Sequence, residues 1–159
     1  FRAVLTGDRR QHPLADEVEL LKRYLDIEAL RLGNRLRLDL HFEALPADLP
    51  VPPLILQPLV ENAVYHGVQP LPQGGSVRIR GAPAPGAYRI CIENPRSNQT
   101  RSGGHGIAQR NVALRLGYAF GPAARLEAVE GLETYSCTVL LPIVAALPDT
   151  SVELPSRQY

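Results

Sequence analysis

Two pairs of short apolar segments in the second half of the chain constrain the fold most. Residues 76–80 and 87–93 alternate apolar and polar side chains and are joined by a predicted turn over residues 81–86. Residues 124–129 and 134–142 form a second pair of the same kind. Segments this close in sequence can pair only as antiparallel hairpins, because a parallel crossover needs roughly a dozen residues or more. The sequence therefore excludes a doubly wound parallel sheet.

The other segments predict helices and one further strand. Residues 15–32 and 106–118 carry apolar side chains at helical spacing, and residues 54–66 are apolar almost throughout. Asp16 is placed to cap the first of these helices. Residues 35–43 alternate as a half-buried strand does. This order of elements predicts an α/β fold: a two-layer sandwich with helices on one face of a mixed, mostly antiparallel sheet.

The composition narrows the class of protein. The length of 159 residues suits one domain, and 45% hydrophobic residues can build a core. The 17 Lys and Arg residues nearly balance the 16 Asp and Glu residues, which argues against a protein that coats a polyanion. No apolar run approaches the ~20 residues that a membrane helix needs. The chain lacks Met and begins at Phe1, so we expect it to be a fragment of a longer protein.

The segment Leu59–Gly67 places polar side chains inside an otherwise apolar helix. Asn62 and His66 are four residues apart and share a helix face, and Glu61 lies about 100° from Asn62 around the axis. A carbonyl oxygen beside a carboxylate suits a hard cation such as Mg²⁺, which commonly bridges to phosphate oxygens. The alternative is a polar helix face at the domain edge that ends at His66 and Gly67. Spacing alone does not decide between the two.

Glycines lead directly into the helix predicted to start at residue 106. The run Gly103-Gly104-His105-Gly106 leaves backbone N–H groups free at a helix start, where the dipole favours phosphate. No Gly-Lys-Ser/Thr follows, so this is not a Walker loop, and no strand immediately precedes it, so it is not a Rossmann loop. The alternative is a flexible surface loop, which the glycines taken alone favour.

The predicted strand before Pro95 ends in an asparagine. Alternation puts Ile90, Ile92 and Asn94 on one face, so Asn94 points inward at the rim of the core. An amide in that place can form a hydrogen bond with the edge of a base, while Glu93 points the other way. The alternative is an ordinary Asn-Pro turn that ends the strand, and this segment alone favours it.

Taken together and in this order, the motifs resemble the ATP-binding domain of sensor histidine kinases of the LytS-like subfamily. That domain has the Bergerat fold of the GHKL superfamily, shared with gyrase B, Hsp90 and MutL. The resemblance is most specific over residues 53–67 and extends to residues 104–116. It divides the chain into the end of an upstream segment, the ATP-binding domain and a flexible C-terminal tail, at residues 1–13, 14–143 and 144–159.

The resemblance implies a role for each candidate residue. Asn62 would hold Mg²⁺ against the ATP phosphates, and Glu61 would be the catalytic residue that orients or activates the attacking group. His66 would contact phosphate or the nucleotide lid at residues 95–105, and Asn94 would take the place of the family's adenine-binding Asp. The second glycine box and the helix after it would cradle the phosphates through Gly104, His105, Gly106, Ile107, Arg110 and Asn111.

The sequence departs from the family pattern at two places. The first glycine box normally reads Asp-x-Gly-x-Gly, but residues 94–98 read Asn-Pro-Arg-Ser-Asn. A neutral amide binds the adenine amino group more weakly than a carboxylate does, so we expect weakened or altered nucleotide binding. The phosphoacceptor histidine lies upstream in this subfamily and is absent here. The fragment by itself should therefore not autophosphorylate.

The implied function is transfer of the γ-phosphoryl group of Mg-ATP to a histidine on the protein's own upstream helix, and then to a response regulator. We expect a homodimer through that upstream segment, and a cytoplasmic domain whose parent is an inner-membrane bacterial sensor. Membrane contact would come only through the upstream part. The alternative is a degenerate nucleotide-binding-fold module that signals through partner contacts. A nucleic-acid binder that uses the arginines is disfavoured by the balanced charge and the few aromatic residues.

Overall fold

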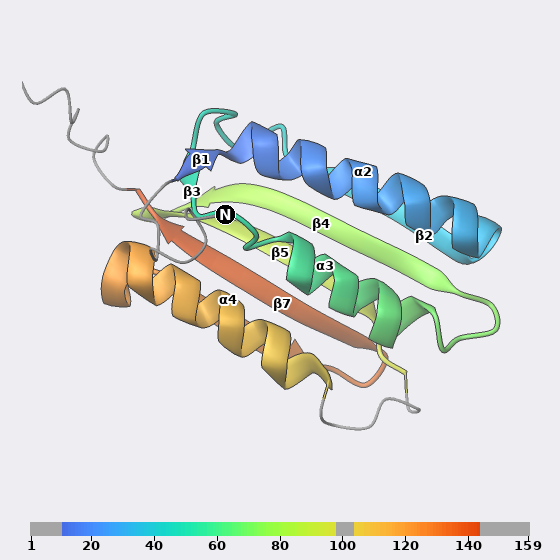
Figure 1. Cartoon of the computed structure of the whole chain (residues 1–159). Coiled ribbons are helices and arrows are strands. Elements are labelled where there is room, and N and C mark those ends of the chain that lie inside the picture. Colours follow the sequence, from blue (N-terminus) through green and yellow to red (C-terminus); the bar gives the residue numbers. More distant parts are fainter. Residues whose placement is uncertain (1–10, 98–103, 144–159) are drawn as a thin grey trace, which may run out of the picture.

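The computed structural model describes residues 11–97 and 104–143, and within them one mixed sheet forms the base of the molecule (Figure 1). Its strand order is β2-β4-β5-β7-β6. β2 runs parallel to β4, and the other neighbouring strands pair antiparallel. The bounds are β2 Leu36–His41, β4 Gly75–Ala84, β5 Ala87–Pro95, β6 Arg125–Glu130 and β7 Thr134–Pro142.

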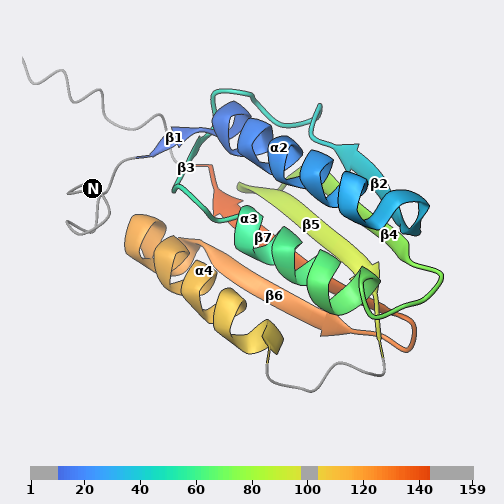
Figure 2. The same cartoon turned by 45° about the vertical axis from the view of Figure 1, so that its right-hand side comes forward.

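The helices α2 (Leu14–Leu32), α3 (Gln57–Asn62) and α4 (Gly104–Phe120) lie side by side on one face of this sheet (Figures 1 and 2). Beside the start of α2, β1 (His12–Pro13) pairs antiparallel with β3 (Pro50–Val51). The arrangement confirms the predicted two-layer α/β sandwich. Within the described ranges, no helix combines the length and apolar character needed to span a membrane.

The core lies between the helices and the sheet. β4, β5 and β7 contribute alternate buried side chains from one face, which confirms the period-two pattern of these segments. Burying each such side chain stabilises the fold by roughly 1.5–3 kcal/mol. The fully buried members include Leu21, Leu25, Ile55, Leu56, Ile79, Ile90, Ile92, Leu116 and Leu141.

The first hairpin turn is shorter than predicted. β4 continues through Gly81 to Ala84, so the turn before β5 contains only Pro85 and Gly86. A Cβ atom at Gly81 would lie 2.7 Å from Cγ of Leu45. The glycine therefore admits the buried Leu45 side chain against the strand and does not interrupt the strand.

The predicted cap of the first helix is wrong. No side chain caps α2; Asp16 lies in its first turn, where its charge interacts favourably with the helix dipole. The backbone N–H groups of Leu14 and Ala15 donate instead to the carbonyl oxygens of Leu49 and Ala47, at 2.8 and 2.9 Å. A loop distant in the sequence supplies the acceptors, which local sequence cannot reveal.

The central helix begins later than predicted and changes its winding. α3 starts at Gln57 rather than at residue 54, because Leu54 has a left-handed backbone with φ of 58°. After Asn62 the chain continues as a π-helix, η2 (Ala63–Val68), closed by a hydrogen bond of 2.9 Å from Gln69 N to Val64 O. π-helical turns are rare and occur frequently at functional sites.

Candidate functional site

Asn62 stands at the junction of α3 and η2. Its side chain is partly buried, and its Nδ2 is buried without a hydrogen-bond partner among the residues that the structure describes. A buried donor left unpaired costs about 1–3 kcal/mol. A ligand oxygen would satisfy this donor, and the Oδ1 of the same amide is the kind of oxygen that Mg²⁺ prefers. The residue predicted to hold Mg²⁺ thus has a buried amide nitrogen without a protein partner among the described residues.

Asn94 points inward from the end of β5, as the alternation predicted. Its side chain is 4% exposed and follows the buried Ile90 and Ile92 on the same face. Its Nδ2 donates a hydrogen bond of 2.8 Å to the carbonyl oxygen of Pro95. Because the amide nitrogen is engaged there, Oδ1 is the atom of Asn94 suited to accept a hydrogen bond from a ligand N–H group.

Gly67 in η2 lies directly against Asn94. A Cβ atom at position 67 would lie 2.9 Å from Cγ and 3.0 Å from Cβ of Asn94. The sequence allows a helix end at His66 and Gly67, but the helix continues to Val68. Glycine is needed here because of a contact with a strand almost thirty residues away, and the sequence offers no local signal for it.

Arg96 fastens the end of β5 to the β6–β7 hairpin. Its backbone N–H donates to the carbonyl oxygen of Glu133 at 2.8 Å, and its NH1 donates to the carbonyl oxygen of Gly131 at 3.0 Å. Its Nε also pairs with Oε1 of Glu130 at 3.1 Å. The arginine that replaces a family glycine is therefore held by the neighbouring hairpin.

Glu61, the predicted catalytic carboxylate, lies on the surface beside α2. It accepts a hydrogen bond of 3.0 Å from Nε2 of Gln57, one turn earlier on its own helix. Burial, and then the negative charges of Glu28 and Glu61, raise the pKa of the Tyr24 hydroxyl well above its usual value. The charge of Glu61 thus acts on a side chain of α2.

His66 is a partly buried residue of η2. Its ring meets the ring of Tyr65 edge-on, with centroids 4.9 Å apart. Burial lowers the pKa of His66 below its ordinary value. Burial therefore favours the neutral imidazole, which offers one ring nitrogen as donor and the other as acceptor.

The second glycine box leads into α4, which begins at Gly104, two residues earlier than predicted. Ile107, Arg110 and Asn111 are exposed on this helix. The predicted lid falls partly on residues 98–103, which lie outside the described part of the chain. The start of α4 provides N–H groups that its own helix does not use, the kind of group that binds phosphate.

The three motifs meet at one end of the sandwich. In both views the end of α3, the end of β5 and the start of α4 lie at the same end of the molecule, and α3 is adjacent to α4 (Figures 1 and 2). The structure therefore brings Asn62, Asn94 and Gly104 to the same end from separate parts of the chain. Among the described residues, no group of three or more His, Cys, Asp or Glu side chains could hold a metal ion.

Comparison with known proteins shows that the chain is similar in sequence to sensor histidine kinases. A scan against protein-family models finds no match. The chain is 27% identical to sensor histidine kinase YesM of Bacillus subtilis over 113 residues, 68% of this chain and 20% of that protein. It is 29% identical to sensor histidine kinase/phosphatase LytS of Staphylococcus aureus over 143 residues, 80% of this chain and 24% of that protein. The chain thus spans a quarter or less of these relatives.

Solved structures give the same fold. The catalytic domain of histidine kinase ThkA matches with a TM-score of 0.62 and 12% identity, covering 84% of this chain and 96% of that domain. ThkA in complex with response regulator protein TrrA matches with a TM-score of 0.56 and 14% identity, covering 85% of this chain and 42% of that chain. The chain has the fold of a histidine kinase catalytic domain, and its sequence relatives are sensor histidine kinases.

Proposed function

We propose that the chain is the ATP-binding catalytic domain of a sensor histidine kinase. It would transfer the γ-phosphoryl group of Mg-ATP to a histidine on its own upstream helix. The observation that carries this proposal is the buried Nδ2 of Asn62, which has no partner in the described part of the chain and belongs to the end of α3, near where β5 ends and α4 starts. The similarity to YesM and LytS supports it independently.

Each side chain has a proposed task in that reaction. Asn62 would hold Mg²⁺, which when bound neutralises charge on the phosphates. Oδ1 of Asn94 would accept a hydrogen bond from the adenine amino group, and His66 would contact phosphate or the lid. The start of α4, from Gly104 to Asn111, would bind phosphate oxygens through its N–H groups and polar side chains. Glu61 would orient the attacking group.

The partners of the whole protein follow from the same proposal. The upstream segment would carry the phosphoacceptor histidine and form the homodimer, and a response regulator would receive the phosphoryl group. The histidine kinase ThkA has been solved with such a regulator, which supports this step. The domain would be the cytoplasmic part of an inner-membrane bacterial sensor. Within the LytS-like kinases, we propose kinship with the alginate-regulator sensor on the sequence of residues 53–67.

Radioactive ATP tests the proposal on the full-length protein. The wild type should become labelled on histidine, and Asn62→Ala should abolish the label because Mg²⁺ and the phosphates lose their shared ligand. Arg23→Ala is the matched control, since Arg23 lies midway along α2 and forms an exposed pair with Glu19 at 2.8 Å. Labelling that persists in Asn62→Ala would refute the magnesium role.

A degenerate module that signals through contacts is the second candidate, and Arg96 favours it. This arginine replaces a glycine of the family's adenine loop and is bonded to the β6–β7 hairpin. Calorimetry with a non-hydrolysable ATP analogue and Mg²⁺ separates the two candidates. A dissociation constant weaker than about 1 mM, or about −4 kcal/mol of binding free energy, would favour the module.

A further inference from the structure

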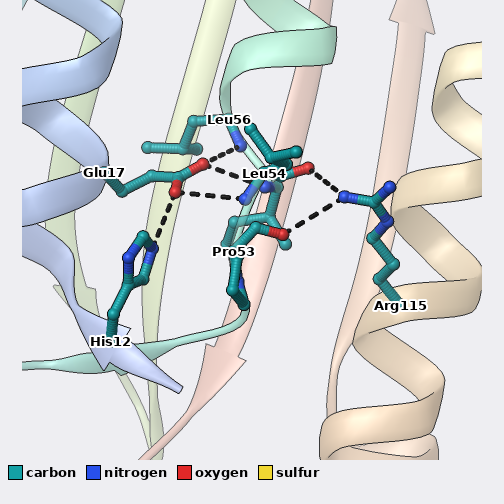
Figure 3. Close-up of polar contacts among 7 residues, drawn as sticks. His12, Glu17, Pro53, Leu54, Leu56 and Arg115 are labelled. Atoms are coloured by element: carbon teal, nitrogen blue, oxygen red, sulfur yellow. Dashed lines mark hydrogen bonds and ion pairs between the residues drawn. The ribbon is translucent and has the colours of Figure 1, made fainter. Parts of the chain in front are cut away.

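The turn that leads into α3 is held by a buried carboxylate of α2 (Figure 3). Glu17 is 2% exposed. Its Oε1 accepts hydrogen bonds from Ile55 N at 2.9 Å and Leu56 N at 3.1 Å, and its Oε2 accepts one from Leu54 N at 3.2 Å. Three consecutive backbone N–H groups thus converge on one side chain. We call these groups and the carboxylate the Glu17 nest.

His12, in the segment before α2, makes a fourth contact with the Glu17 carboxylate. Its Nε2 lies 2.8 Å from Oε2 of Glu17, and β1, which contains His12, pairs with β3 just before the turn. Burying a carboxylate is costly unless it is paired and fully hydrogen-bonded. The four contacts to Glu17 meet that requirement, so the nest is a complete polar cluster inside the sandwich.

Arg115 of α4 holds the same turn from the opposite side (Figure 3). Its NH1 donates to the carbonyl oxygens of Pro53 and Leu54, each at 3.2 Å. Leu54 therefore gives its N–H to α2 and its carbonyl to α4. Its left-handed backbone, with φ of 58°, allows this, and an L-residue in that region costs roughly 1–2 kcal/mol. The bonds on both sides offset that cost.

The nest holds the chain at the entry to α3, a helix without a side-chain cap of its own. No side chain within the helix start caps α3, and Leu56 occupies the N-cap position, where Ser, Thr, Asp or Asn is usual. Glu17 instead accepts the N–H groups of the three residues before the helix, Leu54, Ile55 and Leu56, and so binds the helix entry from α2. The direction in which α3 leaves the turn therefore depends on α2 and α4 together.

We propose that Glu17 and Arg115 are positioning residues for the nucleotide site, an inference that rests on the function proposed above. They set the start of α3, and hence Asn62, relative to α4 and its phosphate-binding start. Asn62 lies five residues beyond the start of α3, or about 8 Å along the axis. A change in the direction of α3 at the turn is carried to the Asn62 amide, and a displacement of about 1 Å can cost about 100-fold in a reaction.

The test compares nucleotide binding with and without Mg²⁺ on the chain as it exists. Calorimetry with a non-hydrolysable ATP analogue gives both dissociation constants. The ratio of interest is the dissociation constant without Mg²⁺ divided by the one with Mg²⁺. In Glu17→Gln and Arg115→Gln we expect this ratio to fall by about tenfold, the effect of losing one charge-assisted bond. Arg23→Ala on α2 should keep the wild-type ratio. A purely structural role would lower the melting temperature and leave the ratio unchanged in protein that circular dichroism shows to be folded.

Arg115→Gln keeps the test valid should Glu17→Gln fail to fold, because Arg115 is exposed and its bonds to Pro53 and Leu54 lie at the surface. A second readout needs no nucleotide: the Asn62 side-chain amide signal in ¹⁵N NMR should shift in both variants and stay in place in Arg23→Ala. If the wild type binds no nucleotide but the Asn62 signal still shifts in the two variants, the proposed function is refuted and the positioning role is supported. An unchanged ratio or an unmoved Asn62 signal in folded variants overturns the positioning role.

Discussion

Gly67 and Asn94 touch across the boundary between the π-helix and the sheet, with only 2.9 Å between a Cβ built on Gly67 and Cγ of Asn94. The contact joins the helix that carries Asn62 to the strand end proposed to bind adenine. It also places the backbone of η2 against a buried amide whose nitrogen is engaged by Pro95. A side chain at position 67 would have to displace one of these two groups.

Gly67→Ala should therefore destabilise the protein by about 1–3 kcal/mol, the usual effect of overpacking. Urea denaturation measures this, and calorimetry should show weaker nucleotide binding as Asn94 moves. Gly117→Ala is the control, since a Cβ there has no atom within 4 Å. Gly117 lies inside α4, so its replacement should stabilise by about 0.5–1 kcal/mol. If Gly67→Ala were as stable as the wild type, Asn94 would be able to move away from position 67 without cost, which contradicts the prediction.

Leu54 should tolerate glycine better than valine. Its φ of 58° suits glycine, whereas a β-branched side chain is strongly disfavoured there. We expect Leu54→Val to be less stable than Leu54→Gly by about 1–2 kcal/mol, although valine keeps more apolar surface. Urea denaturation of both variants gives the difference. Equal stabilities would contradict a left-handed residue at this turn.

Two histidines should titrate in opposite directions from the ordinary value of about 6.5. Burial lowers the pKa of His66. Hydrogen bonds to Glu43 and Asp39 raise the pKa of the exposed His41. NMR titration of the ring signals of the wild type measures both values, with His41→Gln and His66→Gln assigning the signals. A reversed order of the two pKa values would contradict the described surroundings.

The shift of His66 also fixes the sign of a pH effect on stability. The unfolded chain takes up a proton at His66 near pH 6.5, before the folded chain does. The free energy of unfolding should therefore fall as the pH drops below about 6.5 and through the lower folded-state pKa. Urea denaturation at pH 7.5 and 5.5 should show a smaller loss for His66→Gln than for the wild type, and an equal loss would contradict the lowered pKa.

The two cysteines should differ in reactivity. Burial, and then the nearby Cys91, raise the pKa of Cys137 to about 12, which leaves almost no thiolate at pH 8. Cys91 is partly exposed in a shallow hollow on the open face of the sheet, lined also by Arg78, Arg80 and Glu93. We expect iodoacetamide to modify Cys91 in the native protein and both thiols in urea, as mass spectrometry would show. Modification of native Cys137 would contradict its burial.

The elements and the orientation of Asn94 could be predicted from the sequence because they depend on local periodicity. Alternation in residues 87–93 carries Asn94 to the core face whatever the rest of the chain does. Close spacing likewise requires the antiparallel hairpins. Asn62 could also be singled out in the sequence, because a polar amide inside an apolar helix is costly to bury unless it has a partner.

The sequence alone determined which segments are helix and strand, which faces are apolar and which motifs are candidates for the site. Only the tertiary structure decided that Gly81 makes room for Leu45 and that Gly67 admits Asn94. It also decided that Glu17 binds the turn before α3, whose three N–H groups lie 37 to 39 residues further along the chain. The physical reason is that each of these contacts joins segments whose own patterns are independent. Their meeting is set by the packing of the whole sandwich, which no local pattern records.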